Sequence, residues 1–148
     1  MTKLTDNFSL KELTHSITAM NRNIDNTPDA MAIACLRTLA VRVLQPAREY
    51  LGEPITVSSG YRSPKLNKAI GGARYSQHRK GEAADIVCGN NKVVFDFILN
   101  NLDFDQLIWE FGNDEQPDWI HVSYTRGGNR REVLKALKRR GKTVYELY

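Results

Sequence analysis

The chain has few cysteines and few histidines, and it lacks a long hydrophobic run. Its two cysteines, Cys35 and Cys88, do not have C-x-x-C spacing. They fit either two buried thiols or a disulfide. Without about 20 consecutive apolar residues, we expect no membrane span. The opening M-T-K-L-T-D-N-F-S-L has no apolar h-region, so we also expect no secretory signal and synthesis as a soluble cytoplasmic chain.

The rest of the composition is that of an ordinary globular domain. Hydrophobic residues make up 41% and charged residues 26% of the chain, as in most soluble proteins. A length of 148 residues is enough to bury a core without staples, and no repeat or linker divides the chain. We therefore expect one domain over residues 1–148, and a monomer.

Positive charge is concentrated near the C-terminus. Between Arg126 and Lys142 there are eight basic residues and one acidic residue, Glu132. Such a basic patch is either a solvated face or a surface that attracts a polyanion, such as a phosphate-bearing wall polymer or a nucleic acid. No aromatic-interleaved motif accompanies it, so we do not expect a nucleic-acid partner.

Helix signals precede strand signals along the chain. Ser9 and Glu12 form a capping box. Thr27-Pro28-Asp29 then starts a longer helix, with Thr27 as its expected N-cap. Pro46 should bend this helix by removing a hydrogen bond. Further helices are expected over residues 64–70 and 91–102, and strands over residues 55–58, 83–87, 106–111, 119–124 and 142–148.

The order of these elements predicts the fold class. Residues 129–140 are ambiguous, because Val133, Leu134 and Leu137 also fit a helix. Elsewhere helices come first and strands mostly later, without regular β-α-β alternation. This order predicts an α+β domain, with N-terminal helices packed on a mainly antiparallel sheet.

Two short segments hold two of the three histidines. His78 and Asp85 lie in S-Q-H-R-K-G-E-A-A-D and are too far apart to be neighbours on one helix, so a loop and a strand must carry them. His121 lies in the alternating run W-I-H-V-S-Y and can face a cleft while its neighbours pack. Two imidazoles, one carboxylate and an open position make a catalytic Zn²⁺ site.

Two acids are candidates for the general base. Asp118 precedes His121 by three residues, which in a regular strand would place it on the opposite face. The role therefore requires a bend, which Pro117 and the polar run 112–116 favour. Glu110 is the competing base, or a hydrogen-bond partner of a ligand histidine.

These motifs resemble the family of zinc D-alanyl-D-alanine carboxypeptidases and endolysin peptidases, which shares its fold with D-alanyl-D-alanine dipeptidases and the hedgehog signalling domain. The resemblance rests on S-x-H-x-x-G-x-A-x-D, on D-x-x-H in the strand W-I-H-V-S, on S-S-G-Y-R-S-P and on F-D-Q-L-I-W-E. It covers residues 8–124. It implies one zinc on His78, Asp85 and His121, the base at Asp118, Arg62 near the substrate or its oxyanion, and a strand over residues 129–140.

The family also implies a function. We expect a zinc-dependent peptidoglycan peptidase that uses metal-activated water to cleave a stem-peptide or cross-link amide bond, as a carboxypeptidase or an endopeptidase. Gln77 and Tyr61 are further candidates for substrate contact. The alternative is a non-catalytic, zinc-stapled module that binds the cell wall or belongs to a phage particle. Without a secretory signal, the protein would reach the wall through phage-type release or as part of such a particle.

Overall fold

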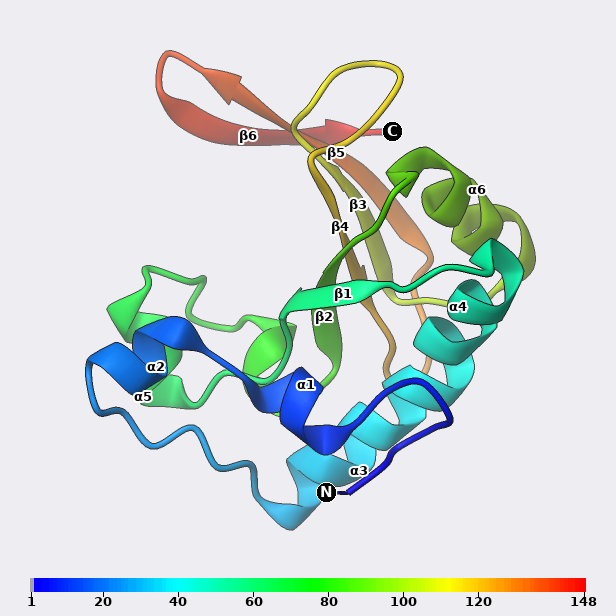
Figure 1. The fold of residues 1–148 in the computed structure, drawn as a ribbon. Coiled ribbons are helices and arrows are strands. Elements are labelled where there is room, and N and C mark those ends of the chain that lie inside the picture. Colours follow the sequence, from blue (N-terminus) through cyan, green and yellow to red (C-terminus); the bar gives the residue numbers. More distant parts are fainter. Residues whose placement is uncertain (1) are drawn as a thin grey trace.

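The computed structural model describes residues 2–148 as helices packed on a six-stranded sheet (Figure 1). The strands are β1 (Thr56–Ser59), β2 (Ala83–Val87), β3 (Gln106–Glu110), β4 (Trp119–Ser123), β5 (Glu132–Arg139) and β6 (Lys142–Leu147). Their order in the sheet is β1-β2-β4-β3-β5-β6. Every neighbouring pair is antiparallel except β3 and β5, which are parallel. The predicted α+β class with a mainly antiparallel sheet is confirmed.

One continuous helical stretch provides much of the core. It comprises α3 (Ala30–Leu39), the π-helical segment η1 (Ala40–Leu44) and α4 (Gln45–Leu51). Asp29, rather than the expected Thr27, caps its N-terminus by accepting a hydrogen bond from the Ala32 backbone N–H at 2.8 Å. Gly52 ends it with a left-handed φ of 74°, which glycine adopts without strain.

Pro46 does not produce the simple bend that we expected. Instead, a π turn precedes it. Proline has no N–H for the carbonyl four residues earlier, and its ring collides with that carbonyl. Just before Pro46 the turn widens, so that the Gln45 N–H bonds to the Ala40 carbonyl five residues back. The π turn accommodates the proline and keeps the helix continuous.

Within residues 2–148, the stretch Ala30–Leu51 is long and apolar enough, by length and composition alone, to cross a membrane. The sequence-based expectation of no span did not anticipate this, because charged residues interrupt the apolar run. In the structure, Leu36, Leu39 and Val43 on this stretch are 0% exposed and belong to the hydrophobic core. In this fold the stretch is therefore a core helix.

The helix α6 (Asn91–Asn101) completes the layer on one face of the sheet. It contacts α4 and rests on β3 and β4. Phe95 meets Trp109 edge to face, with ring centroids 5.2 Å apart, and Trp109 is a core residue. Trp119, by contrast, is half-buried and lines the other face, which the long helices leave open (Figure 1).

The remaining helices are short. They are α1 (Leu10–Thr14), α2 (Ile17–Asn21), α5 (Pro64–Ala69) and the 3-10 helix η2 (Gln77–Lys80). The predicted capping box begins α1, because the Glu12 backbone N–H donates to Ser9 Oγ at 3.2 Å. In Figure 1, α2 and α5 lie across an open gap from the β5–β6 hairpin.

The ambiguous residues 129–140 form a strand, because pairing on both sides decides their conformation. The strand β5 lies between β3 and β6. At its entrance Asp105, which is 3% exposed, accepts hydrogen bonds from the backbone N–H, Nε and Nη2 of Arg130. At its end Arg140 and Gly141 have positive φ values of 52° and 76°, as a two-residue hairpin turn requires.

Both cysteines are free thiols, which decides against the disulfide. Cys35 is buried in α3, and Cys88 is half-buried after β2, where its Sγ lies 3.5 Å from Asn91 Oδ1. Burial raises the pKa of both thiols, so each stays protonated at neutral pH.

Candidate metal centre

The backbone around η2 fixes the position of His78. Ser76 begins this helix by accepting a hydrogen bond from the His78 backbone N–H at 3.2 Å. Gly81 ends it at a φ of 75°, and a Cβ there would lie 2.5 Å from the Ala32 carbonyl oxygen. Glycine is therefore required on two grounds, conformation and space. The resulting turn leaves His78 only 3% exposed.

One contact determines the tautomer of His78. Its Nδ1 lies 2.7 Å from the carbonyl oxygen of Gly60. Because a carbonyl oxygen only accepts hydrogen bonds, Nδ1 carries the proton and the neutral ring has a lone pair on Nε2. That Nε2 lies 3.4 Å from Oδ1 of Asp85, which is also an acceptor.

The sheet brings Asp85 and His121 together. The two residues are direct partners in the β2–β4 ladder, so their side chains share one face. His121 Nδ1 lies 3.1 Å from Asp85 Oδ1. One ligand atom from each of His78, Asp85 and His121 lies within 4.8 Å of the others. The structure thus assembles the three residues that the motifs predicted.

This cluster of acceptors fits a divalent cation. Burial lowers the pKa of His78, so its ring is not readily protonated. A proton shared between His78 and Asp85 is therefore disfavoured, and a cation can take its place. Burial alone would raise the pKa of Asp85, but interactions with His121 and His78 outweigh it and hold that pKa well below its ordinary value. Two imidazole nitrogens and one carboxylate oxygen are a zinc donor set that leaves a position for water. The three residues therefore fit the predicted zinc cofactor.

Arg62 lies beside the ligand carboxylate. Its Nη2 is 3.5 Å from Asp85 Oδ2, its Nε donates to Ser59 Oγ at 3.0 Å, and its Nη1 donates to Asn67 Oδ1 at 3.3 Å. Every guanidinium nitrogen therefore has a protein partner. Burial lowers the pKa of Arg62, but a guanidinium stays charged in proteins. Its expected contact with the substrate or oxyanion stays a prediction.

Glu110 is a buried acid on the same face of the sheet. In the β3–β4 ladder Ile108 pairs with His121 and Glu110 pairs with Trp119, so Glu110 is a diagonal neighbour of His121. Such neighbours lie about 7–8 Å apart, within reach of a long side chain. Glu110 is 7% exposed, and burial raises its pKa to about 7 although His121 opposes the shift. Nε2 of His121 is also buried, without a hydrogen-bond partner among residues 2–148.

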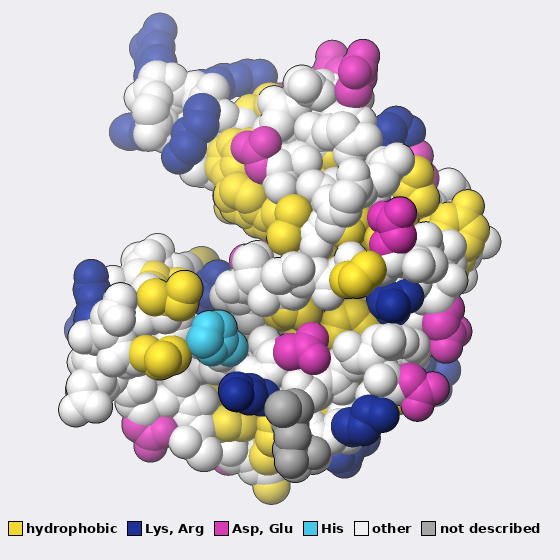
Figure 2. All heavy atoms as spheres, in the orientation of Figure 1, with side chains coloured by type: hydrophobic (Ala, Val, Ile, Leu, Met, Phe, Trp, Pro, Cys, Tyr) yellow, Lys and Arg dark blue, Asp and Glu magenta, His cyan; other side chains and the backbone are white. Residues whose placement is uncertain are grey.

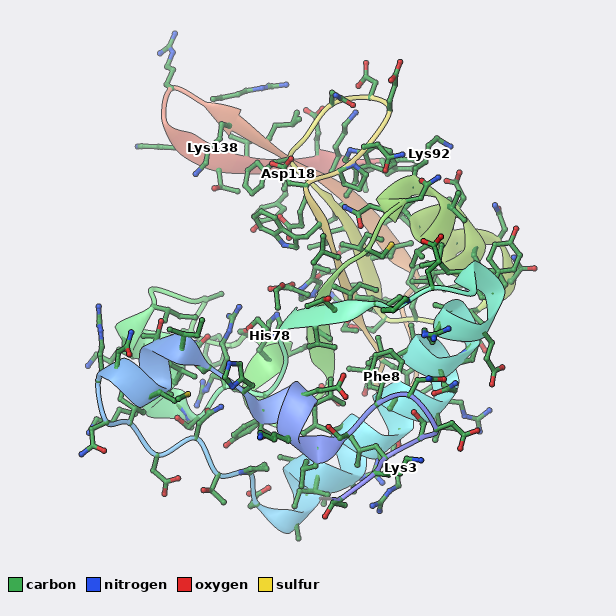
Figure 3. The ribbon with its side chains drawn as sticks, in the orientation of Figure 1. Lys3, Phe8, His78, Lys92, Asp118 and Lys138 are labelled. Carbon is green, nitrogen blue, oxygen red and sulfur yellow. The ribbon has the colours of Figure 1, made fainter. Side chains whose placement is uncertain are left out.

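Asp118 lies elsewhere. It is exposed and stands at the expected bend before β4. Its backbone N–H donates to the Glu110 carbonyl at 2.8 Å, and its own carbonyl accepts from Asn91 Nδ2 at 3.2 Å. Figure 3 shows Asp118 well apart from His78. Of the two candidate bases, Glu110 is among the described residues that line the cleft and Asp118 is not. Its role as base stays a prediction that its position does not support.

The metal cluster lines an open cleft of about 900 Å³. Figure 2 shows the cleft as a deep notch with hydrophobic side chains on its upper wall. One wall is the β5–β6 hairpin and the other is the loop 70–76, which precedes η2. Of the expected substrate contacts, Gln77 lines the cleft. Tyr61 instead belongs to the core, is 8% exposed and lines a separate cavity, so its position does not support substrate contact.

Sequence reasoning missed the contribution of the C-terminal hairpin to this cleft. Lys138 of β5 and Tyr145 of β6 both line it. The alternation in K-T-V-Y-E-L was a signal, because it puts every second residue of β6 on one face. That pattern carries no register. Only the pairing of Ala136 with Glu110 on one side and with Tyr145 on the other puts Tyr145 on the face of Glu110.

Comparison with known proteins agrees with this arrangement. A zinc D-Ala-D-Ala carboxypeptidase from Streptomyces albus G is 46% identical over 48 residues, which are 32% of this chain and 19% of that protein. The matched stretch is thus less than a fifth of the relative's length. The family described as Peptidase M15 matches residues 6–123, well over half of the chain. The match extends through β4 and includes every member of the metal cluster, and the protein belongs to the Peptidase M15 family.

Proposed function

We propose that the protein is a zinc-dependent peptidase that hydrolyses an amide bond in the stem peptides or cross-links of peptidoglycan. The observation that carries the proposal is a buried acid, Glu110, beside an open cluster of two histidines and one aspartate in the wall of a cleft. Family membership supports a peptidase. The name of the Streptomyces relative supports zinc and a peptide that contains D-alanine.

The ligands and their supports are all residues of this chain. His78, Asp85 and His121 would hold the zinc. When bound, zinc supplies a Lewis acid and an activated water, and its charge favours the ionised form of Glu110. The Gly60 carbonyl orients His78 and the Arg62 guanidinium orients Asp85, as outer partners do in metal sites.

Glu110 is the group that we assign to proton transfer. Its carboxylate accepts a proton from the water that attacks the peptide carbonyl, and returns the proton to the nitrogen of the leaving amine. One water is consumed, and one carboxylate and one amine are formed. Burial raises the pKa of Glu110 above its ordinary value, which opposes the effect of the zinc charge and keeps the protonated form within reach of a group that must both accept and donate a proton. Asp118 is exposed and does not line the cleft.

The test compares two substitutions that each turn an acid into its amide. Zinc-loaded protein should release new amino groups from purified peptidoglycan, and a chelator should stop the release. We expect Glu110→Gln to lower the rate by about 10²–10⁴-fold with unchanged zinc content, because general acid–base catalysis contributes that much. Asp118→Asn should stay within about twofold, because its side chain lies outside the cleft.

The outcomes separate the alternatives. Mass spectrometry of the products identifies the cleaved bond. A large loss with Asp118→Asn and none with Glu110→Gln would move the base to Asp118. Zinc-loaded wild-type protein that binds peptidoglycan without cleaving it would overturn the peptidase proposal and support a wall-binding module, which the basic hairpin would suit.

A further inference from the structure

The cleft contains four cationic side chains among the described residues, and two of them are already neutralised. Arg62 is engaged by Asp85. Arg130 makes three side-chain hydrogen bonds of 2.8, 3.1 and 3.2 Å to the carboxylate of Asp105. Neither guanidinium is therefore free to supply the main anchor for an anionic substrate.

The other two cations, Arg74 and Lys138, form no ion pair with any residue of 2–148. Lys138 Nζ donates to the hydroxyl of Thr143 at 3.1 Å. The guanidinium of Arg74 lies over the ring of its neighbour Tyr75, 5.4 Å from the ring centre. Both cations line the cleft, so each offers an unmatched positive charge to whatever occupies it.

These two cations belong to opposite walls. Arg74 is part of the loop 70–76, whereas Lys138 is near the end of the β5–β6 hairpin. Figure 3 shows Lys138 on the hairpin, across the gap from the helix that carries His78. The metal cluster lies in the same cleft. A ligand that fills the cleft would thus contact both cations and the metal centre.

Each wall also carries an exposed tyrosine. Tyr75, next to Arg74, is 80% exposed, and Tyr145 of the hairpin is 54% exposed. The small Ala136 separates Tyr145 from Glu110 in the ladder, on the same face.

We propose that the two walls hold an acidic peptide strand on both sides of the cleaved bond. Arg74 binds a carboxylate on one side and Lys138 binds a carboxylate on the other, while Tyr75 and Tyr145 cover the peptide between them. The inference rests on the proposed function and narrows it to an internal amide bond of a peptide with flanking carboxylates.

The size of the cleft favours an internal bond over the terminal one. A volume of about 900 Å³ is near the upper end of the roughly 300–1,000 Å³ that ligand pockets have. Removal of one terminal residue needs a single carboxylate anchor close to the metal. The cation nearest that place, Arg62, already has a partner on every nitrogen. The free cations are instead divided between the two walls.

The hairpin wall lies outside the part of the chain that the family match covers. That match ends at residue 123, before β5 begins. Lys138 and Tyr145 therefore lie outside the matched region, although both line the cleft. Substrate choice would then depend in part on the hairpin, whereas the metal chemistry and the Arg74 wall belong to the matched region.

A binding experiment tests the inference independently of cleavage. Zinc-loaded Glu110→Gln protein is titrated by calorimetry with a synthetic peptide that has one free carboxylate on each side of an internal amide. The same peptide with both carboxylates amidated is the comparison ligand. We expect R74Q and K138Q, added singly, each to weaken the Kd for the acidic peptide about five- to tenfold, as the loss of a charge-assisted contact does. Neither should change the Kd for the amidated peptide.

The controls remove one positive charge outside the cleft, either from the helix that precedes the loop 70–76 or from the hairpin. Lys68 lies on α5 and Lys142 on β6, and both are exposed. K68Q and K142Q should bind the acidic peptide within about twofold of the parent, because both lysines are exposed and neither lines the cleft. Equal weakening by all four substitutions, no weakening by R74Q and K138Q, or no binding by the parent would each overturn the inference. The proposed function fails separately, if zinc-loaded wild-type protein leaves peptidoglycan intact.

Discussion

Burial sets the behaviour of Glu110 even before a metal is considered. Its carboxyl has a pKa of about 7 in the folded protein against an ordinary 4.5, because it is withdrawn from water. The unfolded chain therefore ionises at lower pH than the folded one. Between about pH 4.5 and 7 the folded state binds more protons than the unfolded state, so stability falls as the pH rises through this window.

This sign leads to a measurement on metal-free protein. Glu110→Gln keeps the shape of the side chain and removes its titration. The thermal midpoint of the variant should therefore rise relative to wild type as the pH increases from about 4.5 to 7, and the difference should level off above pH 7. Glu115→Gln, at an exposed position, should show a constant difference. A constant difference for Glu110→Gln as well would refute the assignment of a raised pKa.

Some residues of the site could be predicted from the sequence, and others could not. His78, Asp85 and His121 could be predicted because their motifs have fixed spacing. The choice between Asp118 and Glu110 could not, because it depends on which residue of β3 stands opposite Trp119. That register is a property of two paired strands and is not written in either one.

Among the elements, the turn after β1 connects the scaffold to the metal centre. A Cβ on Gly60 would lie 2.2 Å from the Leu13 carbonyl oxygen, and the Gly60 carbonyl accepts the hydrogen bond from His78 Nδ1. We expect Gly60→Ala to lower the free energy of unfolding by about 1–3 kcal/mol through overpacking. Displacement of the His78 partner should also weaken zinc binding by about 10-fold or more.

Gly127→Ala is the matched control for that substitution. Its Cβ would meet only Thr125 Oγ1, at an ordinary 3.9 Å. Chemical denaturation and a zinc titration of the two variants measure both effects. If Gly60→Ala behaves as Gly127→Ala does, the turn has more freedom than its contacts indicate.

The entrance of β5 depends on another pair, Asp105 and Arg130. Hydrogen bonds from Arg130 lower the pKa of the buried Asp105 carboxyl. Asp105→Asn should lower the free energy of unfolding at pH 7 by about 1.5–3 kcal/mol, the value of hydrogen bonds to a charged group. Arg130 is 58% exposed, so screening favours the lower end. Denaturant titration measures the difference.

The pH dependence of this variant has a defined sign. Because folding lowers the pKa of Asp105, the stabilisation is present above the ordinary pKa of 3.8 and disappears as the pH falls through the lower, folded value. The difference between wild type and Asp105→Asn should therefore shrink below about pH 3.8. Asp103→Asn, at a position with 79% exposure, should have little effect at any pH. A difference that is independent of pH would exclude the ion pair as its cause.

Elements with strong local signals were predicted well, and elements decided by partners were not. Caps and apolar spacing predicted the long helix. Its π turn could not be predicted, because it arises where Pro46 cannot supply an N–H while the helix continues through the core. Residues 129–140 fit both a helix and a strand. They form β5 because β3 and β6 offer unpaired edges on both sides, which no local pattern records.

In the whole molecule, the β5–β6 hairpin at one edge of the sheet carries much of the basic charge of the C-terminal region. The hairpin that extends the sheet carries basic side chains at its end (Figure 2). Several are neutralised within the hairpin or its surroundings, such as Arg139 by Glu146 at 3.0 Å and Lys135 by Asp114 at 2.9 Å. The positive potential of the basic patch is therefore weaker than its number of basic residues suggests. Lys138 differs from these two because it faces the cleft without an acidic partner among the described residues.

The metal centre joins parts of the chain that are far apart in sequence, so zinc should stabilise the whole fold. One ligand comes from η2 and the other two from the neighbouring strands β2 and β4. These positions come together only in the folded state. A free zinc concentration 100 times the Kd should therefore add about 2.7 kcal/mol to the free energy of unfolding. For a protein of this size that corresponds to a rise of roughly 5–10 °C in Tm.

Calorimetric scans with zinc and with a chelator measure this rise. Asp85→Asn removes a ligand and should abolish it, whereas Asp103→Asn, far more exposed, should keep it in full. The substitution at Asp85 also removes the carboxylate that Arg62 and His121 contact, so the metal-free variant should be less stable than metal-free wild type, and the zinc-induced rise is measured against the metal-free form of each variant. An equal zinc-induced rise in Asp85→Asn would mean that the ion binds elsewhere. The assignment of His78, Asp85 and His121 as the zinc ligands would then be wrong.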